Sequence, residues 1–160
     1  MEPGDAETVT DHSWLVAYTA LILGEKMGLP EERIYKAVSM ALLHDLAEIY
    51  IGDLTPPLST EYRWVKDELE KRFAEKTVHS ETVRRLFIES LEEKTVEARL
   101  VRLSDYLATI MQGVVYRARG YPVDDIVERL KVSAAKLAHD LGLNDNVDKL
   151  VEYVLNSLGE

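Results

Sequence analysis

The sequence predicts an all-α protein whose 160 residues form one domain, residues 1–160. Apolar residues recur with the helical period along the whole chain, and no stretch shows the strict apolar–polar alternation of a strand. Glycine and proline fall between the periodic segments, where they end one helix and begin the next. A chain of this length can bury one substantial core but is too short for two domains of ordinary size.

The first helices follow from their start and stop signals. Thr10 or Asp11 is the predicted N-cap of the first helix, and Gly28 ends it. Pro30 and the two glutamates after it open the second helix, which runs to the loop containing Pro56.

The remaining helices have similar signals. Ser59 or Thr60 caps a polar third helix, residues 120–122 close a long fifth helix, and Gly142 separates the last two. The predicted helices span about 11–27, 31–50, 61–76, 81–91, 95–119, 123–141 and 145–158, a helical bundle of about six to seven helices.

Composition excludes several functional classes. The 19 Lys and Arg against 29 Asp and Glu give a formal net charge of −10, so long nucleic acids and anionic membrane surfaces are not expected partners. The chain has no Cys, which leaves His, Asp and Glu as metal ligands. It shows neither a signal-peptide pattern nor an apolar run of membrane-spanning length, so we expect a cytoplasmic protein.

Ionisable residues interrupt the apolar stripes of three predicted helices. His12 lies at the start of the core-facing stripe of the first helix. Asp45 and Glu48 interrupt the stripe of the second helix, and His44 lies at its edge. Asp105 lies at the edge of a second buried face of the long helix. Burying an unpaired carboxylate costs several kcal/mol, so a cation, a hydrogen-bond network or a metal must compensate these groups.

Two histidines and two aspartates among these residues form a ligand set of nitrogen and oxygen atoms. Such a set suits a divalent transition metal that keeps open positions for water or substrate. Glu48, one turn beyond the His–Asp pair, could hydrogen-bond a metal-bound water. The alternative is that all five are core residues that hydrogen-bond one another.

The order of His12, His44–Asp45 and Asp105 resembles the HD-domain metallophosphohydrolase superfamily. The surrounding residues resemble, more narrowly, the HD-domain 5′-deoxynucleotidase family. The matching segments are 7–14 (ETVTDHSW), 41–48 (ALLHDLAE), 51–56 (IGDLTP) and 102–105 (RLSD). The resemblance covers about residues 7–121, and the helices of residues 122–160 are less diagnostic.

The resemblance implies an HD-type helical bundle that holds one divalent ion, with Co, Mn, Zn, Ni and Mg all compatible with the ligands. It implies that Glu48 orients or deprotonates the attacking water and that Asp53 supports the nucleotide sugar or the geometry beside it. The implied metal ligands are His12, His44, Asp45 and Asp105.

The implied activity is removal of the 5′-phosphate from (deoxy)nucleoside monophosphates. The resemblance also implies a homodimer, with this small nucleotide as its substrate. One alternative is an HD-type hydrolase of another phosphoester or of a nucleoside polyphosphate. A second alternative is a non-catalytic helical binding or regulatory module.

The sequence leaves open which cation meets the phosphate. The family generally has an upstream helix that contributes an Arg, whereas 11 residues precede His12; either this chain lacks that segment or another cation replaces it. Arg117 and Arg119 are candidates for the mouth of a substrate site. The charge run of residues 61–76 and Arg102 are interpreted as solvated faces. His79 and His139 are predicted to be surface or capping residues.

Overall fold

A computed structural model describes residues 7–51 and 63–158, and these residues contain helices and turns but no strand. The all-α prediction is therefore confirmed for the described part of the chain. None of the described helices is long and apolar enough to cross a membrane. The helices are α1 (Val9–Lys26), α2 (Glu31–Ala41), α3 (Glu48–Ile51), α5 (Arg63–Thr77), α6 (Glu81–Glu92), α7 (Val96–Ala118), α8 (Asp124–Asp140) and α9 (Val147–Asn156).

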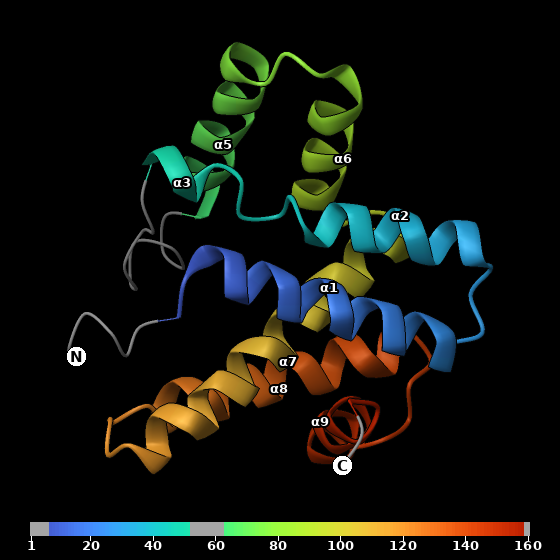
Figure 1. Ribbon diagram of the computed structural model, residues 1–160, viewed down its shortest axis with the longest axis vertical. Helices are drawn as coiled ribbons and strands as arrows, with labels where there is room; N and C mark the ends of the chain where they lie inside the picture. Colours follow the sequence, from blue (N-terminus) through green and yellow to red (C-terminus); the bar gives the residue numbers. More distant parts are fainter. Residues whose placement is uncertain (1–6, 52–62, 159–160) are drawn as a thin grey trace.

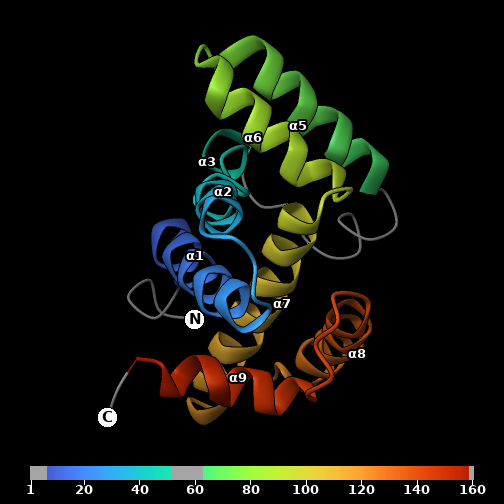
Figure 2. The same cartoon turned by 90° about the vertical axis from the view of Figure 1, so that its right-hand side faces the viewer.

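Helix α7 is the central element of the bundle. Helices α1, α2, α6, α8 and α9 all pack against it (Figure 1). The α5–α6 hairpin lies at one end of α7, and α8 and α9 lie toward the other end (Figure 2). Helix α1 also packs along α2, so α1, α2 and α7 enclose the middle of the molecule.

The main core lies where these helices meet. Its fully buried side chains are apolar and come from both ends of the sequence, which fixes the packing of α1 and α2 on α7. They include Val16, Leu23, Met40, Leu100, Leu103, Leu107, Val127, Leu150 and Val154.

A smaller core joins the α5–α6 hairpin to the segment that follows α2. Ala47, Ala74 and Phe87 are its buried members, and Phe73 packs edge-on against Phe87 with ring centroids 6.3 Å apart. This cluster supports the chain between α2 and α3, which carries His44 and Asp45.

The second predicted helix is wrong beyond Ala41. The sequence predicts one helix over about 31–50, but α2 ends at Ala41, residues 42–47 form turns, and α3 begins at Glu48. A continued helix would give the carbonyl of Ala41 to the N–H of Asp45. Instead His44 Nδ1 lies 2.7 Å from that carbonyl oxygen, and the turns close through shorter bonds such as Leu46 N–H to Leu43 O at 2.9 Å.

The start of the first helix also differs from the prediction. Thr8, not Thr10 or Asp11, is the N-cap of α1. The Thr8 hydroxyl accepts from the N–H of Asp11 at 3.1 Å, and the Asp11 carboxylate accepts from the N–H of Thr8 at 3.4 Å. This reciprocal capping box places the N-cap two residues before Thr10, the first of the two predicted caps. The first turn of α1 is therefore formed before the chain reaches His12.

Replacing Phe87 by Ala should lower the free energy of unfolding by about 3–5 kcal/mol, because Phe87 is fully buried in the smaller core. Urea unfolding followed by circular dichroism measures the change. The matched control is Arg85→Ala on the same helix, whose exposed side chain should leave stability within about 0.5 kcal/mol. Equal effects of the two substitutions would contradict the assignment of Phe87 to a core.

Candidate metal centre

His12 projects from the first turns of α1 toward α7. Its side chain is 15% exposed, and its Nε2 lies 3.1 Å from Asp105 Oδ1. Its other ring nitrogen, Nδ1, lies 3.4 Å from Glu7 Oε2. The backbone N–H of Glu7 donates to the Tyr116 hydroxyl at 2.9 Å, so α7 also fixes the residue that orients His12.

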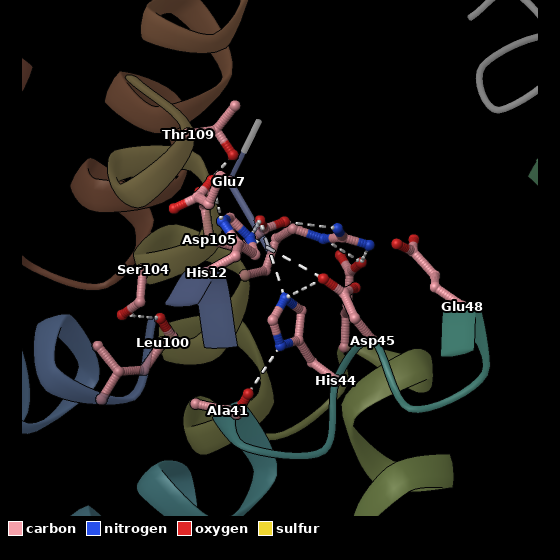
Figure 3. A network of polar contacts seen from close by, with 12 residues as sticks. Glu7, His12, Ala41, His44, Asp45, Glu48, Leu100, Ser104, Asp105 and Thr109 are labelled. Carbon is pink, nitrogen blue, oxygen red and sulfur yellow. Dashed lines mark hydrogen bonds and ion pairs between the residues drawn. The ribbon is translucent and has the colours of Figure 1, made fainter. Parts of the chain in front are cut away.

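His44 enters the same site from the turn after α2 (Figure 3). A carbonyl can only accept, so the contact with Ala41 O places a hydrogen on His44 Nδ1. His44 Nε2 is buried and faces the carboxylates, with Asp45 Oδ2 3.0 Å away as its ion-pair partner. A histidine that ligates a metal normally donates its second N–H to a carbonyl in this way, which leaves the other ring nitrogen directed toward the ion.

Asp105 is the carboxylate that α7 contributes. Its Oδ1 lies 3.1 Å from His12 Nε2 and 4.0 Å from His44 Nε2, while its Oδ2 accepts from Arg102 Nη1 at 3.1 Å. Burial opposes the charged form, but the hydrogen bond with His12 and the charge of Arg102 outweigh it and hold the pKa of Asp105 well below its usual range. Asp105 is therefore ionised at neutral pH.

Asp45 completes the arrangement from the turn beside His44. Its Oδ2 lies 3.0 Å from His44 Nε2 and 3.9 Å from His12 Nε2. Ligands about 2.1 Å from one ion are separated by about 3 to 4.2 Å, depending on the angle between them. The four separations between an imidazole and a carboxylate, 3.0, 3.1, 3.9 and 4.0 Å, fall in this range.

A metal ion therefore fits this group of residues. One ligand atom from each of His12, His44 and Asp105 lies within 4.8 Å of the others, and Asp45 is adjacent to both histidines. The nitrogen and oxygen atoms suit a divalent ion without selecting one metal.

The charge state of the histidines indicates how negative this site is. Burial lowers the pKa of His12, but the hydrogen bonds with Asp105 and Glu7 and the charges of Asp105 and Asp45 raise it to about 10. The carboxylates Asp45 and Asp105 likewise raise the pKa of His44 against the effect of burial. The same field that attracts a proton would attract a divalent cation, which must displace that proton from the ligating nitrogen.

Glu48 lies apart from the imidazoles, on the side of Asp45 (Figure 3). It is the first residue of α3, and its Oε1 accepts from Lys66 Nζ of α5 at 3.0 Å. Glu48 lines a cleft of about 410 Å³ together with His12, Asp45 and Asp105. Glu48 thus lies beside the metal group but outside it. Asp53, which is predicted to support the sugar, lies outside the described residues.

Three residues of the site were not singled out by the sequence. Glu7 precedes α1, so helical periodicity carries no signal for it. Arg102 was interpreted as part of a solvated face, yet its Nε lies 2.7 Å from Glu93 Oε1 and it holds Asp105; the spacing of three residues between Arg102 and Asp105 is the signal that was available. Lys66 belongs to the supposedly solvated run of residues 61–76 but lines the cleft.

The other sequence candidates lie elsewhere. Arg117 binds Asp124 through Nε at 2.7 Å, and neither it nor Arg119 lines this cleft. His79 is exposed, and His139 is 81% exposed in the last turn of α8, as predicted for surface residues.

Comparison with known proteins supports the same interpretation. A family model described as an HD domain matches residues 2–141. The 5′-deoxynucleotidase HDDC2 of Dictyostelium discoideum is 28% identical over 134 residues, which cover 76% of this chain and 69% of that protein. The protein of the same name from Danio rerio is 29% identical over 119 residues. This match covers 69% of this chain and 56% of that protein.

Solved structures share the fold. A conserved hypothetical protein from Pyrococcus furiosus superposes with a TM-score of 0.73 at 28% identity, covering 94% of this chain and 84% of that one. A protein from Pyrococcus horikoshii OT3 gives a TM-score of 0.66 at 30% identity, covering 92% and 84%. The chain belongs to the HD domain family, and this membership together with the His–Asp cluster supports a metal-dependent phosphohydrolase.

Proposed function

We propose that this protein is a metal-dependent phosphomonoesterase that removes the 5′-phosphate from deoxynucleoside monophosphates. The observation that carries the proposal is the convergence of one ligand atom each from His12, His44 and Asp105 within 4.8 Å of one another, beside a cleft that His12, Asp45 and Asp105 line. The two relatives named 5′-deoxynucleotidase favour this substrate class. The proposed metal ligands are His12, His44, Asp45 and Asp105.

A bound divalent ion supplies positive charge beside the phosphoryl oxygens and lowers the pKa of a coordinated water toward neutrality. The protein's own residues do the rest. Glu48 lies on the cleft beside the cluster and accepts the proton of the attacking water. Glu7 and Ala41 orient the two imidazoles, and Arg102 holds Asp105 in its ionised form.

Two further features belong to the proposal. Asp53, in the Gly–Asp segment after α3, supports the sugar of the nucleotide. The protein acts as a homodimer in the cytoplasm on a small nucleotide, without a long nucleic acid or a membrane as partner.

The first rival activity keeps the fold and changes the substrate. A dATP triphosphohydrolase from Cyanophage S-2L is 35% identical over 54 residues, which cover 34% of this chain and 31% of that protein. This similarity makes nucleoside triphosphates the first competing substrates to test. The second rival is a binding or regulatory module in which the same cluster holds a structural metal or none.

Protein loaded with Mn²⁺ or Co²⁺ should release inorganic phosphate from 5′-deoxynucleoside monophosphates, and removal of the metal with EDTA should abolish the release. A malachite green assay for orthophosphate and ion chromatography for pyrophosphate and triphosphate, run over monophosphates, triphosphates and cyclic nucleotides, measure the specificity. Pyrophosphate or triphosphate release from triphosphates alone would favour the first rival. No release from any 5′-monophosphate, with one metal ion per chain confirmed, would overturn the proposal.

Glu48→Gln should lower kcat by about 10²–10⁴-fold, because the amide cannot accept the water's proton. Metal content and melting temperature should stay close to those of the unmodified protein, since Glu48 lies outside the metal group. The matched control is Glu89→Gln, which removes another lysine-paired carboxylate, bound to Lys36 at 2.6 Å and absent from the cleft lining. Unchanged turnover in Glu48→Gln would sink its assignment as the base.

Asp45→Asn should weaken metal binding by more than about 100-fold, because losing only an outer-shell partner of a ligand already costs about 10–100-fold. Metal analysis after dialysis, combined with a competition titration against a chelator, measures the loss. Asp125→Asn is the control, because this exposed aspartate lies in the first turn of α8 and outside the cleft. Retention of the ion at full affinity in Asp45→Asn would reduce the ligand set to His12, His44 and Asp105.

A further inference from the structure

We propose that Lys66 of α5 is the group that binds the phosphate of the substrate, with Glu48 and Glu70 positioning its ammonium at the cleft. The inference deepens the proposed function and rests on it for the nature of the substrate. On this proposal, the Lys66 side of the cleft binds the dianionic phosphate group of a phosphomonoester.

The cleft needs a cation for such a ligand. The carboxylates of Glu7, Asp45, Glu48 and Asp105 all line it, and they would repel a phosphate. The segments outside the described residues, 1–6, 52–62 and 159–160, contain no Lys or Arg in the sequence. Among the described side chains, Lys66 and Arg102 are the Lys and Arg residues that line the cleft.

Three of the five N–H donors of Arg102 are engaged by carboxylates, one on each guanidinium nitrogen. Nε and Nη2 lie 2.7 and 2.6 Å from Glu93 Oε1, and Nη1 donates to Asp105 Oδ2 at 3.1 Å. Turning Arg102 toward a ligand would break its contact with a carboxylate of the metal group. We therefore assign Arg102 to positioning Asp105 rather than to the phosphate.

Lys66 is arranged differently. Its side chain is 25% exposed, and its Nζ donates to Glu48 Oε1 at 3.0 Å and lies 3.7 Å from Glu70 Oε1. An ammonium has three donors, and the distance to Glu70 is too long for a direct hydrogen bond. Lys66 can therefore donate to a phosphate oxygen while keeping its bond to Glu48.

Glu70 lies beside the Lys66 ammonium without fully neutralising it. The two residues are four apart on α5, and Glu70 is only 5% exposed. Burial raises the pKa of Glu70 to about 7 against the opposing charge of Lys66, so Glu70 carries only part of its negative charge at neutral pH. The hydrogen bond to Glu48, together with the charges of Glu48, Glu70 and Asp45, overcomes burial and raises the pKa of Lys66, which therefore stays cationic.

This placement joins phosphate binding to the proposed base. Glu48 contacts Lys66 directly, so a phosphate bound to the ammonium lies beside the carboxylate that accepts the water's proton. Asp45 and Lys66 line the same cleft, so the ammonium and the metal group face one ligand site.

The test is calorimetric titration of Mn²⁺-loaded protein with inorganic phosphate, and separately with an unphosphorylated deoxynucleoside. Lys66→Met should weaken phosphate binding at least 10-fold and leave deoxynucleoside binding and metal content unchanged. Lys66→Arg, which keeps the charge, should recover most of the phosphate affinity. Lys76→Met, an exposed lysine in the last turn of the same helix, is the control and should behave like the unmodified protein.

The double variant Lys66→Met/Glu70→Gln guards against misfolding, because it removes the buried carboxylate that Lys66→Met leaves without its lysine. With a 5′-deoxynucleoside monophosphate as substrate, Lys66→Met should raise KM at least 10-fold. A lower kcat with unchanged phosphate affinity would overturn the proposal and reduce Lys66 to a positioning residue for Glu48. Phosphate binding that depends on Lys66, in a protein that hydrolyses no nucleotide, would support this inference while refuting the proposed function.

Discussion

The buried contact between His12 and Asp105 is the constraint on which the site depends. It joins α1 to α7 across 93 residues of sequence, and it places a partly buried imidazole and carboxylate on two helices that otherwise pack through the main apolar core. Removing both groups from water is costly, and each is also stabilised by a further partner, Glu7 for His12 and Arg102 for Asp105. The main core must therefore hold α1 and α7 in a fixed register, because a shift of either helix would leave these groups buried without partners.

The second constraint is the turn between α2 and α3. His44 reaches the cluster because α2 ends at Ala41, where His44 Nδ1 donates a hydrogen bond to the Ala41 carbonyl. The turn is then held by the smaller core around Phe87, which also packs the α5–α6 hairpin against it. Since Lys66 lies on α5, the same apolar contacts position the metal ligands and the cation across the cleft. Local stability of this hairpin is thus tied to the geometry of the site.

The sequence predicted the chemistry of the site better than its local geometry. His12 and Asp105 were found because ionisable residues on apolar stripes violate helical periodicity, a signal that survives without knowledge of the fold. The end of α2 was missed because a single side chain that bonds a backbone carbonyl leaves no mark on periodicity. Lys66 and Arg102 were missed for a different reason: charges with helical spacing look solvated until a second helix is packed beside them.

The net charge of −10 acquires a specific meaning in the cleft. Four carboxylates and two cations are among its lining residues, so with neutral histidines the lining carries two excess negative charges. A divalent ion would cancel this excess, and the cleft would then no longer repel a phosphate from the Lys66 ammonium. The charge balance thus favours an order in which the metal binds before the nucleotide.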